Sequence, residues 1–330
     1  MENKEIRKQI LNKIIAYEKI IICRHVRPDG DCMGSTIGLR EILRISFPDK
    51  KIYSIGYQTA EYLSFLSLED EKLPEEEYKD ALVIVVDTAN SDRIDNPYYK
   101  SGKEIIKIDH HIRVEDFGTI NYVDEDMPAT ACIITELYEE NRDILQMNQK
   151  AAQALYVGIA TDTGRFRYRG VSAKVLRLSA ILLDYDLDLE KIYANLYLKD
   201  IASLKLQGDV FRKFKSTPNG VLYVYVTNKM QKKYNISPED AAALVNSLDS
   251  VKDSLIWIIF VEQKDKTIRV RIRSRFVAID KLANKYRGGG HANASGAVVY
   301  NGREIKQLVK DADEVLEKFK ASEEGWLWEY

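Results

Sequence analysis

Short apolar runs alternate with longer amphipathic stretches along the first half of the chain. The runs have the length of strands, and most are apolar without a break, as is typical of strands covered on both faces. The stretches between them repeat their apolar residues at helical spacing. We therefore predict strands at 19–24, 51–55, 81–86 and 105–108, and helices at 5–17, 31–46, 129–141, 148–161 and 173–183. Strands that alternate with helices predict an α/β fold with a doubly wound parallel sheet.

The second half of the chain has a different pattern. A continuous helical stretch at 186–215, rich in Leu, Lys and Ala, is interpreted as a connecting helix between two domains. After it we predict strands at 221–227, 255–262 and 267–275, a hairpin at Lys264–Lys266 and a terminal helix at 303–320. The expected organisation is a doubly wound domain over 1–185, a helical linker over 186–215 and a smaller α/β domain over 216–330.

The composition is that of a soluble protein without an overall positive charge. Of the 330 residues, 45% are hydrophobic and 30% are charged, and the formal net charge is −2. Proteins that bind long nucleic acid through its phosphates usually carry a basic excess, so long duplex nucleic acid is not an expected partner. A small nucleotide or a short RNA or DNA oligonucleotide fits this charge balance better.

The sequence contains no recognisable targeting segment. Its charged start argues against a secretion signal, and its longest apolar runs, such as Leu82–Val86, are far too short to cross a bilayer. The three cysteines are an odd number without metal-type spacing, which favours a reducing compartment. We therefore expect a cytoplasmic protein without disulfides or membrane association. The sequence leaves open whether the protein forms a homodimer.

Candidate metal ligands begin directly after the first predicted strand. His25, Asp29 and Asp31 lie within seven residues, in a turn that Pro28 and Gly30 make tight. Imidazole and carboxylate donors together suit a borderline divalent ion such as Mn²⁺, and also Zn²⁺ or Fe²⁺. The alternative is a loop in which Asp31 caps the helix that follows.

Further acidic and imidazole groups lie at the ends of predicted elements. Asp87 directly follows one buried strand, and Asp109, His110 and His111 directly follow the next. Asp162 ends an apolar helix, where the negative end of the helix dipole disfavours a carboxylate unless a cation is bound. Each group has a structural alternative, namely a turn or cap for Asp87 and solvated imidazoles for the two histidines.

These groups are more informative together than apart. The ends of parallel strands meet at one edge of a sheet, which is where α/β folds bind ligands. Four carboxylates gathered there would repel one another and raise their own pKa values. These carboxylates are Asp29, Asp31, Asp87 and Asp162. Two divalent cations would cancel the repulsion, and such a pair also activates water and binds a phosphoryl group. The sequence therefore predicts a two-metal phosphoesterase.

The predicted second domain contains a glycine run beside a histidine. Gly288, Gly289 and Gly290 precede His291, and consecutive glycines allow backbone N–H groups to approach a phosphate closely. His291 is able to donate a hydrogen bond to the same phosphate. The alternative is a flexible turn.

Four arginines alternate along the predicted strand at 267–275, so they share one of its faces. For Arg269 and Arg271, an anion-binding role and a charged, solvated edge strand are equally good interpretations. Arg273 and Arg275 lie nearest to the glycine run and are the better candidates for phosphate binding.

The motifs together resemble a known family. The motifs of the DHH phosphoesterases are matched by His25-x-x-Pro28-Asp29-x-Asp31, Asp87, Asp109-His110-His111 and Asp162. The signature of their DHHA1 domain is matched by Gly288-Gly289-Gly290-His291. The resemblance covers nearly the whole chain and implies an N-terminal DHH domain and a C-terminal DHHA1 domain. The length and layout are most similar to the branch of stand-alone nano-RNases and phosphoadenosine-phosphate phosphatases.

The resemblance also implies a role for each residue. One metal ion would be held by His25, Asp29 and Asp87, and the other by Asp31, Asp87, His110 and Asp162. His111 would bind or protonate the phosphate, and Asp109 would orient a histidine. The substrate phosphate or nucleotide would be held by Arg273, Arg275, Gly289, Gly290 and His291.

The activity that the resemblance implies is Mn²⁺-dependent hydrolysis of short oligonucleotides to mononucleotides, of 3'-phosphoadenosine 5'-phosphate to AMP, or of both. The second domain would favour short substrates. One alternative is hydrolysis of cyclic dinucleotides or of their linear products, and another is a nucleotide-binding regulator without turnover. The tail Trp326-Leu327-Trp328 is interpreted either as a docking segment for a partner or as a segment that packs on the second domain.

Overall fold

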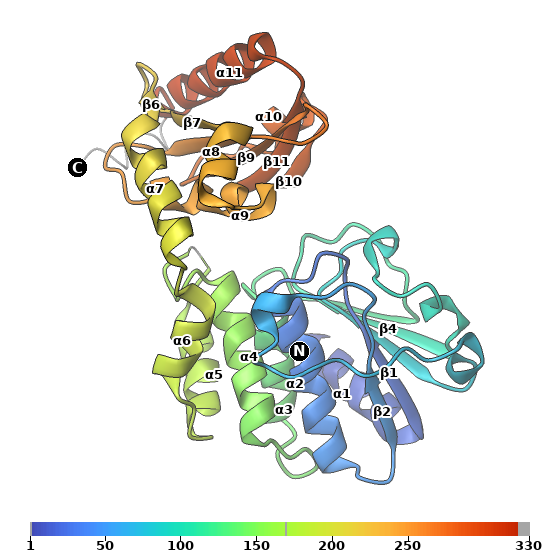
Figure 1. The fold of residues 1–330 in the computed structure, drawn as a ribbon. Coiled ribbons are helices and arrows are strands. Elements are labelled where there is room, and N and C mark those ends of the chain that lie inside the picture. Colours follow the sequence, from blue (N-terminus) through green and yellow to red (C-terminus); the bar gives the residue numbers. More distant parts are fainter. Residues whose placement is uncertain (1, 169, 323–330) are drawn as a thin grey trace. The chain divides into compact units, whose positions relative to one another are not determined.

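The computed structural model describes residues 2–168 and 170–322 and divides the chain into two compact units (Figure 1). The first unit ends at Leu198 and the second begins at Lys199. Each unit has its own sheet and its own apolar core. The tail Trp326-Leu327-Trp328 lies outside the described residues, so both of its interpretations stay predictions.

A five-stranded sheet organises the first unit, and its neighbouring strands are all parallel. The order across the sheet is β2-β1-β3-β4-β5. The strands are β1 Lys19–Cys23, β2 Lys51–Ser54, β3 Leu82–Val86, β4 Glu104–Asp109 and β5 Ile120–Val123. The first four confirm the predicted strands and the α/β class. The strand β5 was not predicted, because it is short and only one of its residues is buried.

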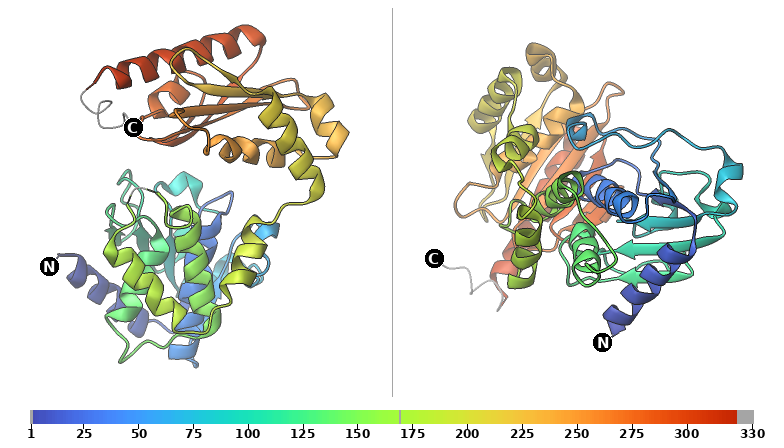
Figure 2. Two further views of the ribbon diagram at one scale, coloured as in Figure 1. Left: turned by 90° about the vertical axis from the view of Figure 1, so that its left-hand side faces the viewer. Right: turned by 90° about the horizontal axis from the view of Figure 1, so that it is seen from below.

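The two faces of this sheet are covered differently. Ile20 and Ile22 pack into a core formed with helices, whereas Ile21 points to the opposite face. On that opposite face the cover comes from short 3₁₀ turns and loops, with Tyr78 and Tyr99 among the buried side chains. Figure 2 shows the helices of this unit gathered along one side of the sheet.

The helices of the first unit are α1 Glu2–Ala16, α2 Gly30–Ser46, α3 Thr130–Glu139, α4 Gln149–Asp162, α5 Ala173–Leu183 and α6 Leu189–Tyr197. The 3₁₀ turns are η1 Glu61–Leu63, η2 Glu75–Tyr78, η3 Ser91–Arg93 and η4 Tyr99–Ser101. The predicted helices of this half are confirmed, within a few residues at their ends.

Helices α2 and α4 pack closely enough to bring two acidic residues together. An added Cβ at Gly34 would lie 2.4 Å from the carbonyl oxygen of Ala154 in α4, so only glycine allows this approach. An added Cβ at Gly158 would likewise lie 2.9 Å from Asp31 Oδ1. The packing therefore places the first turn of α2, with Asp31, beside the last turn of α4, with Asp162.

The single helix predicted over 186–215 is wrong, because the structure forms two helices there. They are α6 Leu189–Tyr197 and α7 Ile201–Lys213. Asp200 starts α7, because its carboxylate accepts a hydrogen bond from the backbone N–H of Ser203 at 2.8 Å. Tyr193 of α6 packs against the first core, whereas Leu206 of α7 belongs to a core of the second unit. The uniformly helical composition of the stretch concealed this break.

A six-stranded mixed sheet organises the second unit, in the order β10-β11-β9-β8-β7-β6. The strands β7 and β8 are parallel, and the other neighbours are antiparallel. The strands are β6 Lys215–Ser216, β7 Leu222–Val226, β8 Ile256–Glu262, β9 Ile268–Ser274, β10 Gly289–His291 and β11 Ala294–Val299. The predicted strands β7, β8 and β9 are confirmed, and so is the hairpin at Lys264–Lys266 that joins β8 to β9.

Helices lie against both faces of the second sheet. Leu308 and Leu316 of α11 pack on one side, and Leu206 and Val210 of α7 pack on the other. The helices are α8 Asn228–Tyr234, α9 Pro238–Ala243, α10 Asp280–Asn284 and α11 Gly302–Lys320, with a 3₁₀ turn η5 Leu244–Leu248. Helix α11 confirms the predicted terminal helix. In the part of the chain that the structure describes, no helix combines the length and apolar character needed to cross a membrane.

Candidate metal centre

The predicted metal ligands gather at the carboxyl edge of the parallel sheet. His25 lies just beyond β1, Asp87 directly follows β3, and Asp109 ends β4. These three strands are neighbours, so their ends bring the side chains to one place. The first turn of α2, with Asp31, and the last residue of α4, Asp162, reach the same edge.

One group of donors surrounds the ring of His25. Its Nε2 atom lies 3.4 Å from Asp29 Oδ2 and 3.4 Å from Asp87 Oδ2. Its Nδ1 atom lies 2.7 Å from the carbonyl oxygen of Val26. Because a carbonyl oxygen only accepts hydrogen bonds, Nδ1 carries a proton, and in the neutral ring the lone pair of Nε2 faces the carboxylates. The thiol of Cys32 completes this group, within 4.8 Å of the other donor atoms.

A second group of donors surrounds His110. Its Nε2 atom lies 3.4 Å from Asp87 Oδ1, 3.6 Å from Asp162 Oδ2 and 3.7 Å from Asp31 Oδ2. Its Nδ1 atom lies 3.2 Å from the carbonyl oxygen of Met127, so the lone pair of Nε2 again faces carboxylates. Within the described residues, this buried Nε2 has no hydrogen-bond partner. A buried polar atom of this kind usually has a partner, which a bound cation or a water would provide here.

Asp87 connects the two groups. Its Oδ2 faces His25 and its Oδ1 faces His110, and the hydroxyl of Thr130 donates to Oδ1 at 3.1 Å. The backbone of Asp87 has a φ of 54°, a left-handed conformation that is uncommon outside Gly, Asn and Asp. Asp87 is therefore a carboxylate that the two donor groups share.

The N-terminus of α3 holds Asp31 in place. The backbone N–H groups of Thr130 and Ala131 donate to its two oxygens at 2.6 Å and 2.9 Å. The hydroxyl of Ser35 donates to Oδ1 at 3.2 Å. The positive end of the helix dipole stabilises a carboxylate at this position. Asp31 is therefore fixed by the fold while its Oδ2 still faces His110.

Burial and mutual repulsion change the acidity of these carboxyl groups. Burial, followed by repulsion from Asp87, raises the pKa of Asp31 well above its ordinary value. Burial, followed by repulsion from Asp31, raises the pKa of Asp162 in the same way. Burial would also raise the pKa of Asp29, but the hydrogen bond and charge of His25 and the hydrogen bonds with Cys32 together outweigh burial and lower this pKa to about 2. A cation among these groups would relieve the repulsion.

The imidazole and thiol groups respond to the same surroundings. Burial lowers the pKa of His25, but the neighbouring Cys32 and the hydrogen bonds with Asp29 and Asp87 outweigh burial and raise it. Burial lowers the pKa of His110 and is not offset by Asp87. Burial raises the pKa of the Cys32 thiol to about 12.

The spacing of both groups fits a divalent cation. Hydrogen bonds from nitrogen to oxygen usually measure about 2.7–3.2 Å. The separations of 3.4–3.7 Å between His Nε2 and carboxylate oxygens are longer than that. Two neighbouring ligands that each lie about 2.1 Å from one ion are themselves about 3.0–3.4 Å apart. Imidazole nitrogen and carboxylate oxygen are also donors that divalent ions accept together. Both groups are therefore compatible with divalent metal binding.

His111 forms a further donor group with Asp87 and His110, and it is held by Asp109. Asp109 Oδ1 accepts hydrogen bonds from His111 Nδ1 at 2.8 Å and from the His111 backbone N–H at 3.2 Å. Burial lowers the pKa of His111, but the hydrogen bond with Asp109 and the negative charges of Asp87 and Asp109 together outweigh burial and raise it. The ammonium of the fully buried Lys107 lies 3.3 Å from Asp109 Oδ2. This chain of contacts fixes both the orientation and the proton of Nδ1 in His111.

The residue that caps α2 is Asp29, so the interpretation of Asp31 as the cap is wrong. Asp29 Oδ1 accepts a hydrogen bond from the backbone N–H of Cys32 at 3.1 Å, while Asp29 Oδ2 faces His25. Asp31 lies inside the first turn and is fully buried. The two oxygens of Asp29 therefore serve the helix and the donor group at once.

Three further residues at this edge were not predicted. Cys32 directly follows Asp31, but the cysteines lack the spacing of a metal site made of cysteines alone. Lys107 is a lysine inside a buried strand, and that buried charge was the available signal. Thr130 had no signal, because its contact with Asp87 depends on where α3 meets the sheet.

The glycine run of the second unit forms the edge strand β10, so its interpretation as a flexible turn is wrong. An added Cβ at Gly288 would lie 2.0 Å from the carbonyl oxygen of Gly296, and Gly290 has a φ of 139°. The fold therefore requires glycine at both positions. At Gly289 the nearest atom to an added Cβ would be Asn284 Oδ1, at 3.5 Å. The fold alone does not require glycine there.

The arginines of β9 alternate with its buried residues and share one face, as predicted. Arg269 forms an ion pair with Glu239 at 2.5 Å, which favours the structural interpretation of this residue. Arg275 lies beyond the strand end, donates to the carbonyl oxygen of Asp249 and lies over the ring of Trp257.

Arg273 and His291 lie in one row across the second sheet. Ala294 of β11 pairs with His291 on one side and with Arg273 on the other. Paired residues of antiparallel strands point to the same face, so both side chains flank the small Ala294 on one surface. His291 and the glycines beside it are exposed. The structure thus brings a cation and an imidazole together at an accessible edge.

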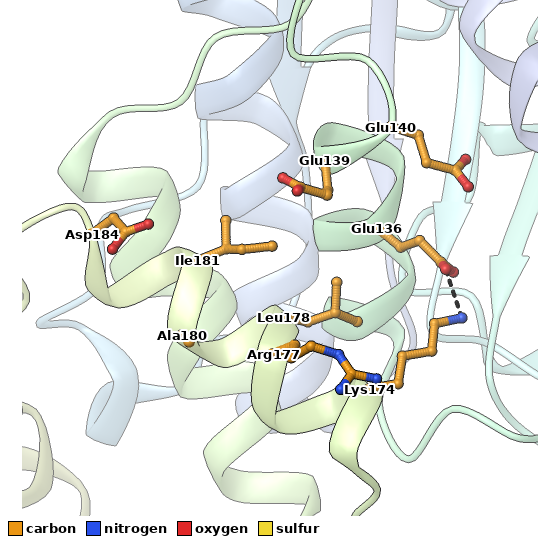
Figure 3. Close-up of a pocket in the computed structure, with 9 residues that line it drawn as sticks. All are labelled: Glu136, Glu139, Glu140, Lys174, Arg177, Leu178, Ala180, Ile181 and Asp184. Atoms are coloured by element: carbon orange, nitrogen blue, oxygen red, sulfur yellow. Dashed lines mark ion pairs between the residues drawn. The ribbon is translucent and has the colours of Figure 1, made fainter.

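A groove of the first unit lies between α3 and α5 and contains none of these residues (Figure 3). It is lined by Glu136, Glu139, Glu140, Lys174, Arg177, Leu178, Ala180, Ile181 and Asp184. Lys174 pairs with Glu136 at 2.6 Å, and Arg7 pairs with Glu136 and Glu140 at 3.1 Å and 2.7 Å. Glu136, Glu140 and Lys174 are therefore paired within the first unit itself.

Comparison with known proteins agrees with the motifs. The chain matches the DHH family, N-terminal domain, over residues 19–159 and the DHHA1 domain over residues 219–318. It is 38% identical over 306 residues to the bifunctional oligoribonuclease and PAP phosphatase NrnA of Bacillus subtilis, which covers 92% of this chain and 97% of the relative. A cyclic-di-AMP phosphodiesterase, PdeA of Listeria monocytogenes, is 24% identical over 306 residues, or 86% of this chain and 45% of the relative.

Among solved structures, an exopolyphosphatase-related protein from Bacteroides fragilis has the same arrangement of elements. It superimposes with a TM-score of 0.86 at 25% identity, over 96% of this chain and 97% of the other. The match spans both units, and the sequence matches place a DHH domain before a DHHA1 domain in the predicted order. The chain therefore belongs to the DHH family, in the form that carries a C-terminal DHHA1 domain.

Proposed function

We propose that this protein is a two-metal phosphoesterase that hydrolyses short oligoribonucleotides to mononucleotides and 3'-phosphoadenosine 5'-phosphate to AMP. The observation that carries the proposal is the position of Asp87. Its two oxygens each lie 3.4 Å from a histidine nitrogen, one in the His25 group and one in the His110 group. The Bacillus subtilis relative, which is similar across both units, supports the choice of substrates.

In this proposal each donor group holds one divalent ion. One ion is held by His25, Asp29 and Asp87, and the other by Asp31, Asp87, His110 and Asp162. Bound there, two such ions supply an activated water and positive charge for the phosphoryl group. Mn²⁺ is the proposed metal, because the donors shared by both groups are nitrogen and oxygen.

We assign proton transfer to His111. Asp109 accepts a hydrogen bond from Nδ1, so this nitrogen keeps its proton and the imidazolium form is stabilised. The raised pKa of His111 means that more of it is protonated at neutral pH than of an ordinary histidine. A protonated imidazole beside the donor groups is suited to bind a phosphate oxygen and to protonate the leaving oxygen.

Substrate binding is assigned to the accessible edge of the second sheet. Arg273 and His291 flank Ala294 on one face, where each is able to donate to a phosphate oxygen. Gly289 has room for a Cβ yet carries none, which supports close approach of a ligand to its backbone. We include Gly290 and Arg275 in this surface because both adjoin it.

A cytoplasmic location is part of the proposal. The cysteines Cys23, Cys32 and Cys132 are buried free thiols, which a reducing compartment preserves.

A substrate panel with Mn²⁺ tests the proposal. A five-nucleotide RNA, a twenty-four-nucleotide RNA and 3'-phosphoadenosine 5'-phosphate are compared at equal enzyme, with Asp87→Ala as the control for a contaminating hydrolase. We expect turnover of the short RNA and of the bisphosphate, little turnover of the long RNA, and none by Asp87→Ala. Equal or better turnover of the long RNA would overturn the proposed preference for short substrates.

A second candidate, hydrolysis of cyclic dinucleotides or their linear products, is supported by the similarity to PdeA at 24% identity. Adding cyclic di-AMP and its linear product to the panel separates the two candidates by relative kcat/KM. A regulator without turnover is the remaining alternative from another functional class. It predicts nucleotide binding without phosphate or mononucleotide release, whereas the complete set of donors in both groups favours catalysis.

A further inference from the structure

The thiol of Cys32 lies where the apolar core of the first unit meets the donors of the first group. Its Sγ is within 4.8 Å of the donor atoms of His25, Asp29 and Asp87. The side chain is completely buried and is within hydrogen-bonding reach of His25. A soft sulfur donor therefore adjoins a nitrogen and two carboxylate oxygens.

The start of α2 fixes the direction of this thiol. The backbone N–H of Asp29 donates to Cys32 Sγ at 3.2 Å, and the backbone N–H of Cys32 donates to Asp29 Oδ1 at 3.1 Å. This reciprocal pair is a capping box in which cysteine takes the place of the usual Glu or Gln. Asp29 Oδ2 faces His25 from the same turn. The turn therefore holds Cys32 Sγ on the side of α2 that faces the ring of His25.

We propose that Cys32 is a fourth donor to the ion held by His25, Asp29 and Asp87. The inference rests on the proposed metal centre and adds a sulfur to one of its two sites. Binding breaks the S–H bond, forms a bond from sulfur to the ion, and releases the thiol proton to solvent. The first site then has nitrogen, oxygen and sulfur donors, whereas the His110 site has nitrogen and oxygen donors alone.

The difference in donors gives the two sites different preferences. Thiolate donors favour softer ions such as Zn²⁺, Co²⁺ and Cd²⁺, whereas carboxylate donors suit Mn²⁺ and Mg²⁺. The first site is therefore expected to take a soft ion more readily than the second. The protein would accept two different ions at once when both kinds are present.

The competing explanation is that Cys32 serves the helix cap alone. Serine at this position would still offer an acceptor to the Asp29 N–H, but its hydroxyl is a poor donor to a soft ion. Cys32→Ser therefore keeps the cap and removes the sulfur. Cys132 provides a matched control, because it is buried in α3 near Asp31 and Asp162 but belongs to none of the donor groups found in the described residues.

The test is Co²⁺ titration of the metal-free full-length protein, followed by absorption spectroscopy. Bound Co²⁺ gives visible ligand-field bands, and a bond from thiolate to Co²⁺ adds a charge-transfer band in the near ultraviolet. We expect the wild type and Cys132→Ser to develop the charge-transfer band with one equivalent of Co²⁺. Cys32→Ser should keep ligand-field bands and lose the charge-transfer band.

Each outcome decides between distinct claims. Ligand-field bands without a charge-transfer band in the wild type would overturn the role of Cys32 and leave the metal centre standing. No bound Co²⁺ at all would overturn the metal centre itself. Persistence of the charge-transfer band in Cys32→Ser, or its loss in Cys132→Ser, would assign the bond to another thiol. If Cys32→Ser does not fold, the charge-transfer band in the wild type and in Cys132→Ser still shows whether a thiol other than Cys132 binds the ion.

A competition measurement supplies an independent readout. The ratio of the Kd for Mn²⁺ to the Kd for Cd²⁺ measures the preference of the first site for soft ions. We expect Cys32→Ser to reduce this ratio by about tenfold or more, and Cys132→Ser to leave it unchanged. An equal ratio in all three proteins would overturn the proposal even if metal binding is normal.

Discussion

The carboxyl edge of the first sheet and the glycine edge of the second both carry predicted functional residues, but their surroundings differ. At the first edge, Asp31 and Asp87 are buried with carboxylates and imidazoles around them, and repulsion from Asp87 adds to burial in raising the pKa of Asp31. At the second edge, His291 and the glycines are exposed, and Arg269 already has a partner in Glu239. Burying these charges without a ligand lowers the stability of the fold. Exposed charges, by contrast, are stabilised by water alone.

The largest expected effect is at Asp87, the carboxylate that both donor groups share. Replacing it with alanine removes one oxygen from the His25 group and one from the His110 group. We expect Asp87→Ala to lower kcat by at least about 10³-fold, because the proposed reaction depends on both ions. The measurements are initial rates with Mn²⁺ and the metal content after dialysis.

Asp92→Ala is the control for Asp87→Ala, because Asp92 is exposed in η3, a few residues along the same connection. It should keep full activity and two ions. If Asp87→Ala retained most of its rate and its metal, the two donor groups would not act as one centre.

His111 is the next test of the buried edge. Removing an acid or base that acts in the transition state usually lowers the rate by about 10²–10⁴-fold. We expect His111→Ala to lower kcat within that range while metal content stays at the wild-type level. Asp109→Asn should give a smaller loss, because it leaves the ring in place and weakens the bond that orients it. A His111 variant that loses metal instead would reassign this residue to the ligands.

The exposed edge should respond in KM rather than in kcat. We expect His291→Ala to raise KM about tenfold, which corresponds to the loss of about 1.4 kcal/mol of binding free energy. Metal content should not change, because His291 belongs to the second unit and the donor groups belong to the first. Steady-state kinetics with the short RNA and the bisphosphate measure both parameters. An unchanged KM for both would remove His291 from the binding surface.

Gly289→Ala sharpens the same comparison without removing a charge. An added methyl group has room in the fold but would occupy the surface that a ligand approaches. We expect it to raise KM and to leave the free energy of unfolding nearly unchanged. Gly208→Ala, in α7, is the control, because nothing lies within 4 Å of its added Cβ. Within a helix, alanine is more favourable than glycine by about 1 kcal/mol.

The two edges also differ in how much of them could be predicted from the sequence. The strands of the first unit and the residues that follow them were predictable, because continuous apolar runs mark parallel strands and three of the four runs end directly before Asp or His. The edge strand β10 and its partner β11 were not predictable, because Gly-Gly-His carries no apolar pattern. The contact of Thr130 with Asp87 joins residues that are far apart in sequence, and only the packing of α3 creates it.

Metal-free stability should depend on pH through the buried carboxyl groups. Burial and repulsion raise the pKa of Asp162 above its ordinary value, so the folded chain holds a proton that the unfolded chain releases. This stabilisation is complete below the ordinary carboxyl pKa of about 3.9 and is lost as the pH rises through the raised value. The free energy of unfolding without metal should therefore fall with rising pH.

Asp162→Asn separates the contribution of Asp162 from that of His110. The lowered pKa of His110 makes the free energy of unfolding rise with pH, whereas the raised pKa of Asp162 makes it fall. Without metal, the variant and the wild type should have similar stability near the ordinary carboxyl pKa, and the variant should become more stable at neutral pH by about 1 kcal/mol. Mn²⁺ at about 100 times its Kd should stabilise the wild type by about 2.7 kcal/mol for each ion bound, and the variant by less. Denaturant unfolding at several pH values measures this, and parallel curves for the two proteins would contradict it.

The smallest effect is expected at Arg269, and it tests whether the arginines of β9 act as one surface. The pair with Glu239 is partly exposed, and such pairs contribute about 0–1 kcal/mol to stability. We expect Arg269→Ala to change KM by less than about twofold, and Arg273→Ala, beside the glycine edge, to raise it several-fold. Equal increases in KM for both variants would mean that the whole arginine face binds the anion. The exposed edge would then need a ligand for its charges as much as the buried edge does.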